Sequence, residues 1–217
     1  MTEVAYRKPL AEALLLPLPA VTTASDTMAN GGIKERGAIF TRREVVDFIL
    51  DLCGYTADRP LYQYRLLEPA FGHGDFLVAA IERLLHAYFS QHRNSTDPVS
   101  DLAEAIRAVE VHRDSLDSAR ARIAPILSSH GLKSADAAKI LDRWIVEGDF
   151  LLVDMPCDFT HAIGNPPYVR QELLPERLMA EYRARYKTIY DRADIYVPFI
   201  ERSLSLLAPS GVLGFIC

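Results

Sequence analysis

Cysteine is scarce in this sequence: Cys53, Cys157 and Cys217 lie far apart and form no Cys-x-x-Cys pair. An odd number of scattered cysteines argues against a disulfide framework and indicates reduced thiols, as in a cytoplasmic protein. The six histidines show no metal-ligand spacing with these cysteines. We therefore expect neither a structural zinc nor another metal.

Long apolar runs and an excess of basic charge are also missing. The stretch LAEALLLPLPAV near the N-terminus contains two prolines and is too short to cross a bilayer, so we expect no membrane span. We interpret residues 1–36 as an N-terminal arm. The net charge of −5 argues against a general polyanion-binding surface, but it does not exclude a local basic groove.

Short apolar strands that alternate with amphipathic helices are the main pattern in the rest of the chain. This alternation predicts an α/β fold with a doubly wound, mainly parallel sheet. The expected strands lie at about 64–67, 105–112, 143–150, 160–165 and 212–217, and the expected later helices begin at about 75, 114 and 194. A sheet that ends on a buried-type strand predicts a domain that is incomplete at its C-terminus, as in a fragment or one half of a larger protein.

The first expected helix follows residue 41. Thr41 is a candidate N-cap, with Glu44 three residues later as in a capping box, and Gly54 is suited to end the helix. Val45, Ile49 and Leu52, with Val46 and Phe48 beside them, form the expected apolar stripe.

Ligands of open parallel sheets bind at the carboxyl ends of the strands. The segment LLEPAFGHGDFL contains such an end, where Gly72 and Gly74 allow the backbone to approach a ligand closely. The motif lacks the third glycine of a dinucleotide fingerprint and the lysine of a phosphate-binding loop, which argues against phosphate binding. An ordinary tight turn between strand and helix is the alternative.

Two later strand ends carry carboxylates. Glu110 is placed to accept hydrogen bonds from two ribose hydroxyls. Asp149 and Phe150 suit an adenine, because the acid accepts from the exocyclic amine while the ring stacks. A solvated charge at Glu110, and a loop cap beside a core phenylalanine, are the alternatives.

The stretch AIGNPPYVRQE ends the fourth expected strand. Asn165 and Pro166 each precede a proline, which favours extended conformations, and neither proline has an N–H. The segment therefore offers the Asn165 side-chain oxygen and the Pro166 carbonyl as acceptors, with Tyr168 as a flat face beside them. Such a site favours a planar amine, as in a nucleobase or an amide.

In this order, GAIFTRREVVDFIL, LLEPAFGHGDFL, AVEVHRDSL, IVEGDFLL and AIGNPPYV resemble the motifs of S-adenosylmethionine-dependent DNA adenine-N6 methyltransferases of the gamma, TaqI-like arrangement. The resemblance runs from about Gly37 to the C-terminus and implies a class I, Rossmann-like methyltransferase domain over residues 37–217. It also implies the N-terminal, catalytic part of such an enzyme, with the target-recognition domain absent.

The resemblance assigns roles to individual residues. Asn165 and Pro166 would bind the target amine, and Tyr168 would stack on the flipped base. Asp194 and Tyr196 would border the site. The implied cofactor-binding residues are Thr41 with its approach at 37–40, Glu68, Pro69, Ala70, Gly72, Gly74, Phe76, Glu110, Asp149, Phe150, Asn165 and Pro167.

The implied partner is double-stranded DNA with an adenine target, in a restriction–modification or related defence system. The short segment before the first motif leaves no space for a fused nuclease domain. One alternative is an RNA or protein-glutamine amine methyltransferase, because such an enzyme also binds a planar amine through hydrogen-bond acceptors. The second alternative is a split or truncated cofactor-binding subunit. Such a subunit needs either a separate specificity subunit or the missing C-terminal domain.

Overall fold

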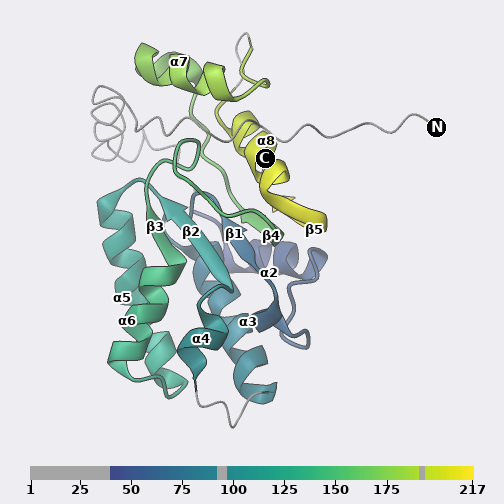
Figure 1. Ribbon diagram of the computed structural model, residues 1–217, viewed down its shortest axis with the longest axis vertical. Helices are drawn as coiled ribbons and strands as arrows, with labels where there is room; N and C mark the ends of the chain where they lie inside the picture. Colours follow the sequence, from purple (N-terminus) through teal and green to yellow (C-terminus); the bar gives the residue numbers. More distant parts are fainter. Residues whose placement is uncertain (1–39, 92–96, 191–193) are drawn as a thin grey trace, which may run out of the picture.

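The computed structural model describes residues 40–91, 97–190 and 194–217. In these residues a five-stranded sheet is covered by helices on both faces (Figure 1). The expected arm at 1–36, and residues 37–39 of the approach to Thr41, lie outside the described residues.

The sheet is parallel throughout, with the strand order β3-β2-β1-β4-β5. The strands are β1 (Leu66–Glu68), β2 (Ile106–Glu110), β3 (Ile145–Glu147), β4 (Phe159–Gly164) and β5 (Leu207–Phe215). The chain proceeds outward from β1 to β2 and β3, then returns to the other side of β1 with β4 and β5. This order confirms the predicted doubly wound α/β fold.

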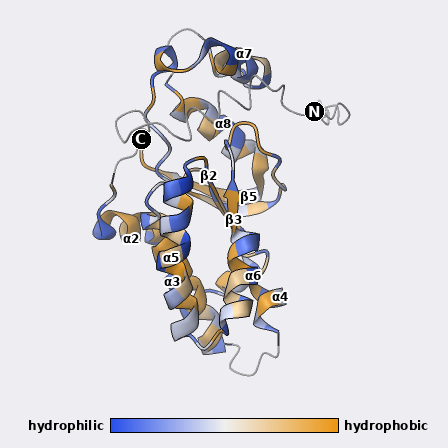
Figure 2. Cartoon of the chain, turned by 90° about the vertical axis from the view of Figure 1, so that its left-hand side faces the viewer, coloured by the Kyte–Doolittle hydropathy of each residue, from blue (hydrophilic) through white to orange (hydrophobic). Residues whose placement is uncertain are grey.

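Successive residues of the strands point to opposite faces of the sheet, and each face has its own core. Leu66, Ala108 and Ile163 belong to one buried cluster, whereas their neighbours Leu67, Val109 and Ala162 belong to the other. Strands β1, β2 and β4 are buried along most of their length and carry apolar residues on both faces, as expected for a parallel sheet, whereas the edge strands β3 and β5 are more exposed. Figure 2 shows the apolar sides of the helices turned toward the sheet.

Two groups of helices cover the two faces. Side chains of α2 (Arg43–Leu52), α3 (Asp75–Gln91), α4 (Pro98–Leu102), α5 (Arg113–Ser129) and α6 (Ser134–Trp144) enter the first cluster. The second cluster takes its helical side chains from α7 (Glu176–Arg185) and α8 (Tyr196–Leu206). Two short 3₁₀ turns, η1 (Leu61–Gln63) and η2 (Gln171–Leu173), complete the described elements.

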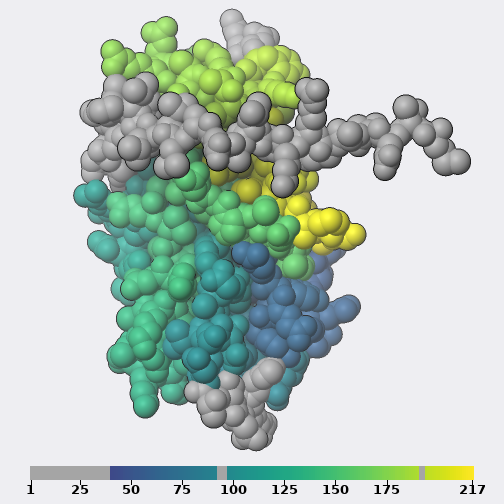
Figure 3. Space-filling view, in the orientation of Figure 1, coloured from purple at the N-terminus to yellow at the C-terminus, as the bar shows by residue number. Residues whose placement is uncertain are grey.

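Helix α7 lies beyond the carboxyl ends of the strands, at one end of the molecule (Figures 1 and 3). Helices α6 and α7 were not predicted from the sequence. Both follow helical spacing: Leu178 and Tyr182 of α7 are buried four residues apart, as are Ala137 and Leu141 of α6. Among the described residues, no helix is long and apolar enough to cross a membrane.

The predicted orientation of α2 was wrong. Val46 and Leu50 are fully buried, whereas Val45 and Leu52 of the expected stripe are 41% and 70% exposed. The predicted capping box is also wrong, because α2 has Arg42 as its N-cap and no side-chain cap hydrogen bond. The main-chain N–H of Thr41 instead donates to Asp75 Oδ2 at 3.1 Å. Gly54, with φ of +70°, follows the helix end as predicted.

The last strand begins earlier than predicted, at Leu207 instead of residue 212. Ala208 precedes Pro209, which disfavours helical geometry at that point. The ladder with β4 is irregular here: Phe159 pairs with Leu207, but His161 pairs with Val212. Ser210 takes a φ of +67° within the extra residues, and α8 ends at Leu206, directly before the strand.

Candidate active site

The neighbouring strands β1 and β4 mark the point at which the strand order reverses, where ligands of doubly wound sheets bind. Glu68 ends β1, and Asn165 directly follows β4. The two strand ends lie close together: a Cβ added at Gly164 would lie 3.4 Å from Glu68 Cγ and 3.7 Å from Pro69 Cδ. Pro69 and Ala70 continue from Glu68 into the glycine turn.

The glycine turn between β1 and α3 leaves open space on one side. Gly72 and Gly74 have φ values of +54° and +81°, which other residues rarely adopt. A Cβ added at Gly72 would meet no atom of the described residues within 4 Å. Phe76, one turn further on, is 4% exposed and packs in the core beneath the turn. The turn therefore presents bare backbone at the switch point.

Glu110 is held rigidly beside this turn. Its Oε2 accepts from Gly72 N at 2.8 Å, and its Oε1 accepts from Val111 N and His112 N, each at 2.9 Å. A carboxylate has about four accepting positions, so these three donors leave one on Oε2. The side chain is 5% exposed. Its position is fixed by backbone donors from two loops and does not depend on a flexible partner.

Asp149 lies in the turn after β3, next to the end of β2, since Gly148 N donates to Glu110 O at 2.9 Å. Its Oδ1 accepts from Leu151 N at 2.9 Å, and its Oδ2 accepts from the hydroxyl of Tyr182 on α7. Burial raises the pKa of this carboxyl, and the hydrogen bonds from Tyr182 and Leu151 oppose the increase. The carboxylate is thus oriented by its own turn and by a helix that follows the Asn-Pro-Pro-Tyr segment.

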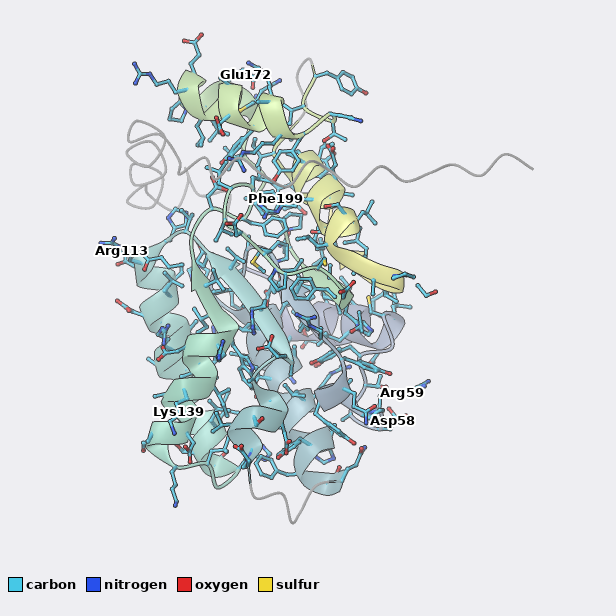
Figure 4. The ribbon with its side chains drawn as sticks, in the orientation of Figure 1. Asp58, Arg59, Arg113, Lys139, Glu172 and Phe199 are labelled. Atoms are coloured by element: carbon cyan, nitrogen blue, oxygen red, sulfur yellow. The ribbon has the colours of Figure 1, made fainter. Side chains whose placement is uncertain are left out.

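Phe150 lies deeper than its neighbour. It is 2% exposed, its ring centroid is 5.1 Å from that of Phe199, and the Arg202 guanidinium lies 5.0 Å from the ring centroid. Phe199 projects from α8 into the region between the sheet and α7 (Figure 4). Phe150 therefore anchors the turn in the second core, directly after Asp149.

Thr41 and Asn165 meet across the site although 124 residues separate them. The Asn165 side-chain amide donates to Thr41 Oγ1 at 3.2 Å. Asn165 Oδ1 is buried and has no hydrogen-bond partner within the described part of the chain. Because the amide nitrogen is engaged by Thr41, the oxygen is the free end of the side chain. This arrangement leaves Asn165 as an oriented acceptor.

The segment after Asn165 is held in place by a hydrogen bond from Tyr168. Pro166 is buried and Pro167 is partly exposed. The hydroxyl of Tyr168 donates to Ile216 O at 2.9 Å, just after β5, and its ring lies 6.2 Å from that of Tyr196. Tyr196, the first residue of α8, therefore lies beside this segment, while Asp194 O accepts from Val197 N at the start of the helix.

Glu68 adds an unpaired acidic group at the switch point. It is 2% exposed, and its Oε2 has no hydrogen-bond partner in the described ranges. Burial, and then the nearby charges of Asp75 and Glu110, raise its pKa well above the ordinary value for a glutamate. A buried acceptor beside two other carboxylates suits a ligand that carries a positive charge or several donors. Within residues 40–91, 97–190 and 194–217, no group of three or more His, Cys, Asp or Glu side chains is placed to hold a metal.

Two residues that contact this site, Asp75 and Tyr182, were not predicted from the sequence. Asp75 accepts from the main chain of Thr41 and lies near Glu68. Tyr182 donates to Asp149 from a helix that was not predicted. The spacing of Leu178, Tyr182 and Tyr186 indicates a helix with its tyrosines on one face, and this signal was available in the sequence.

A doubly wound parallel sheet whose strand-end carboxylates and glycine turn meet at the switch point defines a Rossmann-like domain. The same fold occurs in a structure described as a putative class I S-adenosylmethionine-dependent methyltransferase from Listeria monocytogenes, with a TM-score of 0.50. That similarity covers 89% of this chain and 50% of the other at 14% identity, and it concerns the fold alone.

Residues 104–217 match the family described as Eco57I restriction-modification methylase, and the chain belongs to this family. It is 55% identical over 210 residues to the type II methyltransferase M.PaeR7I of Pseudomonas aeruginosa, covering 97% of this chain and 36% of that protein. It is also 55% identical over 183 residues to M.XhoI of Xanthomonas vasicola, covering 84% and 34%. The chain therefore spans about a third of the length of these relatives. Family membership confirms the resemblance to restriction-modification methyltransferases that the motifs indicated.

Proposed function

We propose that this chain is the cofactor-binding and catalytic part of a site-specific DNA methyltransferase that methylates the N6 amine of adenine. The observation that carries the proposal is the buried, unpaired oxygen of Asn165, oriented by Thr41 at the switch point of the sheet. An acceptor so placed favours a ligand that brings a donor, because a buried polar atom without a partner is costly. A planar amine supplies that donor.

The residues at the strand ends fit S-adenosylmethionine. Glu110 has one accepting position left, so it would accept from one ribose hydroxyl and not from two as expected, and Asp149 with Phe150 would hold the adenine. The unpaired Oε2 of Glu68 and the open space at Gly72 lie where a charged, donor-rich methionine portion is expected. When bound, this cofactor supplies an electrophilic sulfonium methyl group.

The chain's own residues would prepare the amine. Asn165 Oδ1 and the Pro166 carbonyl would accept its two hydrogens, which favours a more tetrahedral nitrogen with its lone pair directed at the methyl group. In-line transfer then depends on positioning more than on acid–base chemistry. The target base must leave the duplex at a cost of about a few kcal/mol, and stacking on Tyr168 would return about 1–3 kcal/mol.

In this proposal, the DNA sequence is recognised by parts of the protein other than this chain. The matched relatives are about three times as long as the aligned part, and both are named type II methyltransferases. The net charge of −5 agrees with a catalytic part whose grip on DNA lies in further sequence or in a separate specificity subunit. The proposed location is the cytoplasm, where cofactor and DNA are both present.

Calorimetric titration of the chain with S-adenosylmethionine, followed by transfer of labelled methyl groups, tests this function. DNA, RNA and protein pools are the acceptors, and mass spectrometry identifies the product in hydrolysed DNA. We expect cofactor binding and N6-methyladenine in an assay of the full-length protein, and Asn165→Ala should retain binding but lose transfer. Label in RNA or in glutamine, N4-methylcytosine as the product, or normal transfer by Asn165→Ala would contradict the proposal.

A further inference from the structure

Tyr182 reaches the proposed adenine-binding carboxylate from a separate helix. It lies on α7, which follows the Asn-Pro-Pro-Tyr segment, and is 2% exposed. Its hydroxyl donates to Asp149 Oδ2, while Oδ1 accepts from Leu151 N. Each carboxylate oxygen has two accepting positions, so one remains on each for a ligand. The two donors therefore determine the directions from which a further donor can approach.

Two other side chains hold the same turn through its backbone. Tyr186, one helical turn after Tyr182, donates to Leu151 O at 2.6 Å. Arg202 of α8 donates to Phe150 O and Val153 O. Among the described hydrogen bonds to this turn from α7 and α8, only that of Tyr182 reaches the Asp149 carboxylate. Its hydroxyl thus has a role that backbone anchoring does not explain.

The charged and titratable groups that face Asp149 come from both helices. Tyr182 and Arg185 of α7 and Arg202 of α8 all lower its pKa, against the increase caused by burial. The nearby Tyr186 also interacts electrostatically with Asp149. Tyr182 makes the largest of the lowering contributions, because it donates a hydrogen bond directly to the ionised form.

We propose that Tyr182 is a positioning and specificity residue, which orients the Asp149 carboxylate so that it selects an amino-purine over an oxo-purine in the cofactor. This inference rests on the proposed function. An exocyclic amine donates to the carboxylate, whereas an oxo group at the same position presents a second acceptor. A site built to receive a donor discriminates strongly against an analogue without it, because the buried acceptor is left unpaired.

Tyr182→Phe tests the inference, with Tyr186→Phe as the matched control, because Tyr186 is the C-cap residue of the same helix and its hydroxyl donates to the same loop turn after β3. Each protein is titrated calorimetrically with S-adenosylhomocysteine and with its inosine counterpart, in which a carbonyl replaces the amine. Wild type should prefer the adenosine compound. Tyr182→Phe should reduce this preference about tenfold, the value of a hydrogen bond to a charged group, whereas Tyr186→Phe should keep it whatever its overall affinity.

The pH dependence provides a readout that a purely structural role would not change. Binding of the adenosine compound needs the ionised carboxylate, so affinity falls as pH decreases through the Asp149 pKa. Removal of the Tyr182 hydroxyl raises that pKa, and the loss of affinity should move to higher pH in Tyr182→Phe but not in Tyr186→Phe. In an Asp149→Asn background, Tyr182→Phe should have little further effect on the preference.

Site-specific 3-fluorotyrosine at position 182 gives an independent test if Tyr182→Phe fails to fold. Fluorination makes the phenol a stronger donor with almost no change in shape, so the acid loss of affinity should move to lower pH. An unchanged preference and pH profile in these proteins, while wild type binds S-adenosylhomocysteine, would overturn the inference alone. Failure of wild type to bind either compound would overturn the proposed function.

Discussion

The side-chain amide of Asn165 donates to the hydroxyl of Thr41 at 3.2 Å. This hydrogen bond fixes which end of the asparagine is free, because the amide nitrogen is used and Oδ1 has no partner in the described chain. Thr41 is itself held by Asp75, which accepts from its main-chain N–H at 3.1 Å. The orientation of the proposed amine acceptor is thus set by the start of α2 and the start of α3.

Thr41→Val should slow methyl transfer by the full-length protein about tenfold, since one oriented hydrogen bond contributes about 1 kcal/mol or slightly more. Valine keeps the branched shape of threonine but removes the acceptor for the amide. Single-turnover measurements with saturating cofactor and DNA report this step. Thr41→Ser, which restores the hydroxyl, should recover most of the rate; equal rates for the valine and serine variants would exclude the orienting role.

Tyr168→Ala should weaken binding of DNA that contains an extruded or mismatched target base about tenfold or more, because stacking on an aromatic ring contributes about 1–3 kcal/mol per base. Tyr168→Phe keeps the ring and loses only the hydrogen bond to Ile216 O. Fluorescence titration with 2-aminopurine at the target position distinguishes the two. The stacking role fails if the phenylalanine variant is impaired as strongly as the alanine variant.

Glu68→Gln should raise the melting temperature of the cofactor-free protein at neutral pH. The folded-state pKa of Glu68 lies well above its unfolded value, so the native state retains the proton more strongly. The group therefore costs stability as pH rises from the unfolded pKa through the folded one, and glutamine removes that cost. Thermal unfolding between acidic and neutral pH measures the effect, and the difference between the two proteins should disappear in acid. A lower melting temperature of Glu68→Gln at neutral pH would contradict the expectation that ionised Glu68 destabilises the cofactor-free protein. The same variant should bind S-adenosylmethionine more weakly.

Gly214→Ala should destabilise the fold by about 1–3 kcal/mol, the usual cost of overpacking a core. A Cβ at this position of β5 would lie 2.2 Å from Cys53 Sγ, at the end of α2. Urea unfolding measures the loss. Cys53→Ala removes the clashing sulfur, so the double variant Cys53→Ala/Gly214→Ala should be more stable than Gly214→Ala alone. Additive losses from the two substitutions would show that the sulfur is not the obstacle.

The sequence predicted the parts of this structure that depend on local pattern. The parallel sheet followed from apolar strands that alternate with helices, and the site from polar residues at their carboxyl ends. The face that α2 buries did not follow, because the apolar side of the helix is broad and contains Val45, Val46, Phe48, Ile49, Leu50 and Leu52. Periodicity cannot choose the buried positions within so broad an apolar side, and the packing of α2 in the first core buries Val46 and Leu50.

Contacts between residues far apart in the sequence could not be predicted either. The link from Thr41 to Asn165 and that from Tyr182 to Asp149 join residues 124 and 33 positions apart, and no local pattern reports them. Helix α7 was missed because its sequence, ERLMAEYRAR, is mostly charged and polar. Its few apolar side chains are sufficient to hold the helix in place only because they pack into a core that the rest of the chain forms.

The central position of β1 has a consequence for how this protein folds. Its two neighbours, β2 and β4, lie on either side of it, and the Thr160 hydroxyl accepts from Arg65 N across a separation of 95 residues. Such distant parallel pairings carry a large loop-closure entropy and form slowly. Asn165 follows β4 directly, so it cannot meet Glu68 until that pairing is complete. We therefore expect binding competence to be acquired late in refolding, and bound cofactor to slow global unfolding more than it speeds folding.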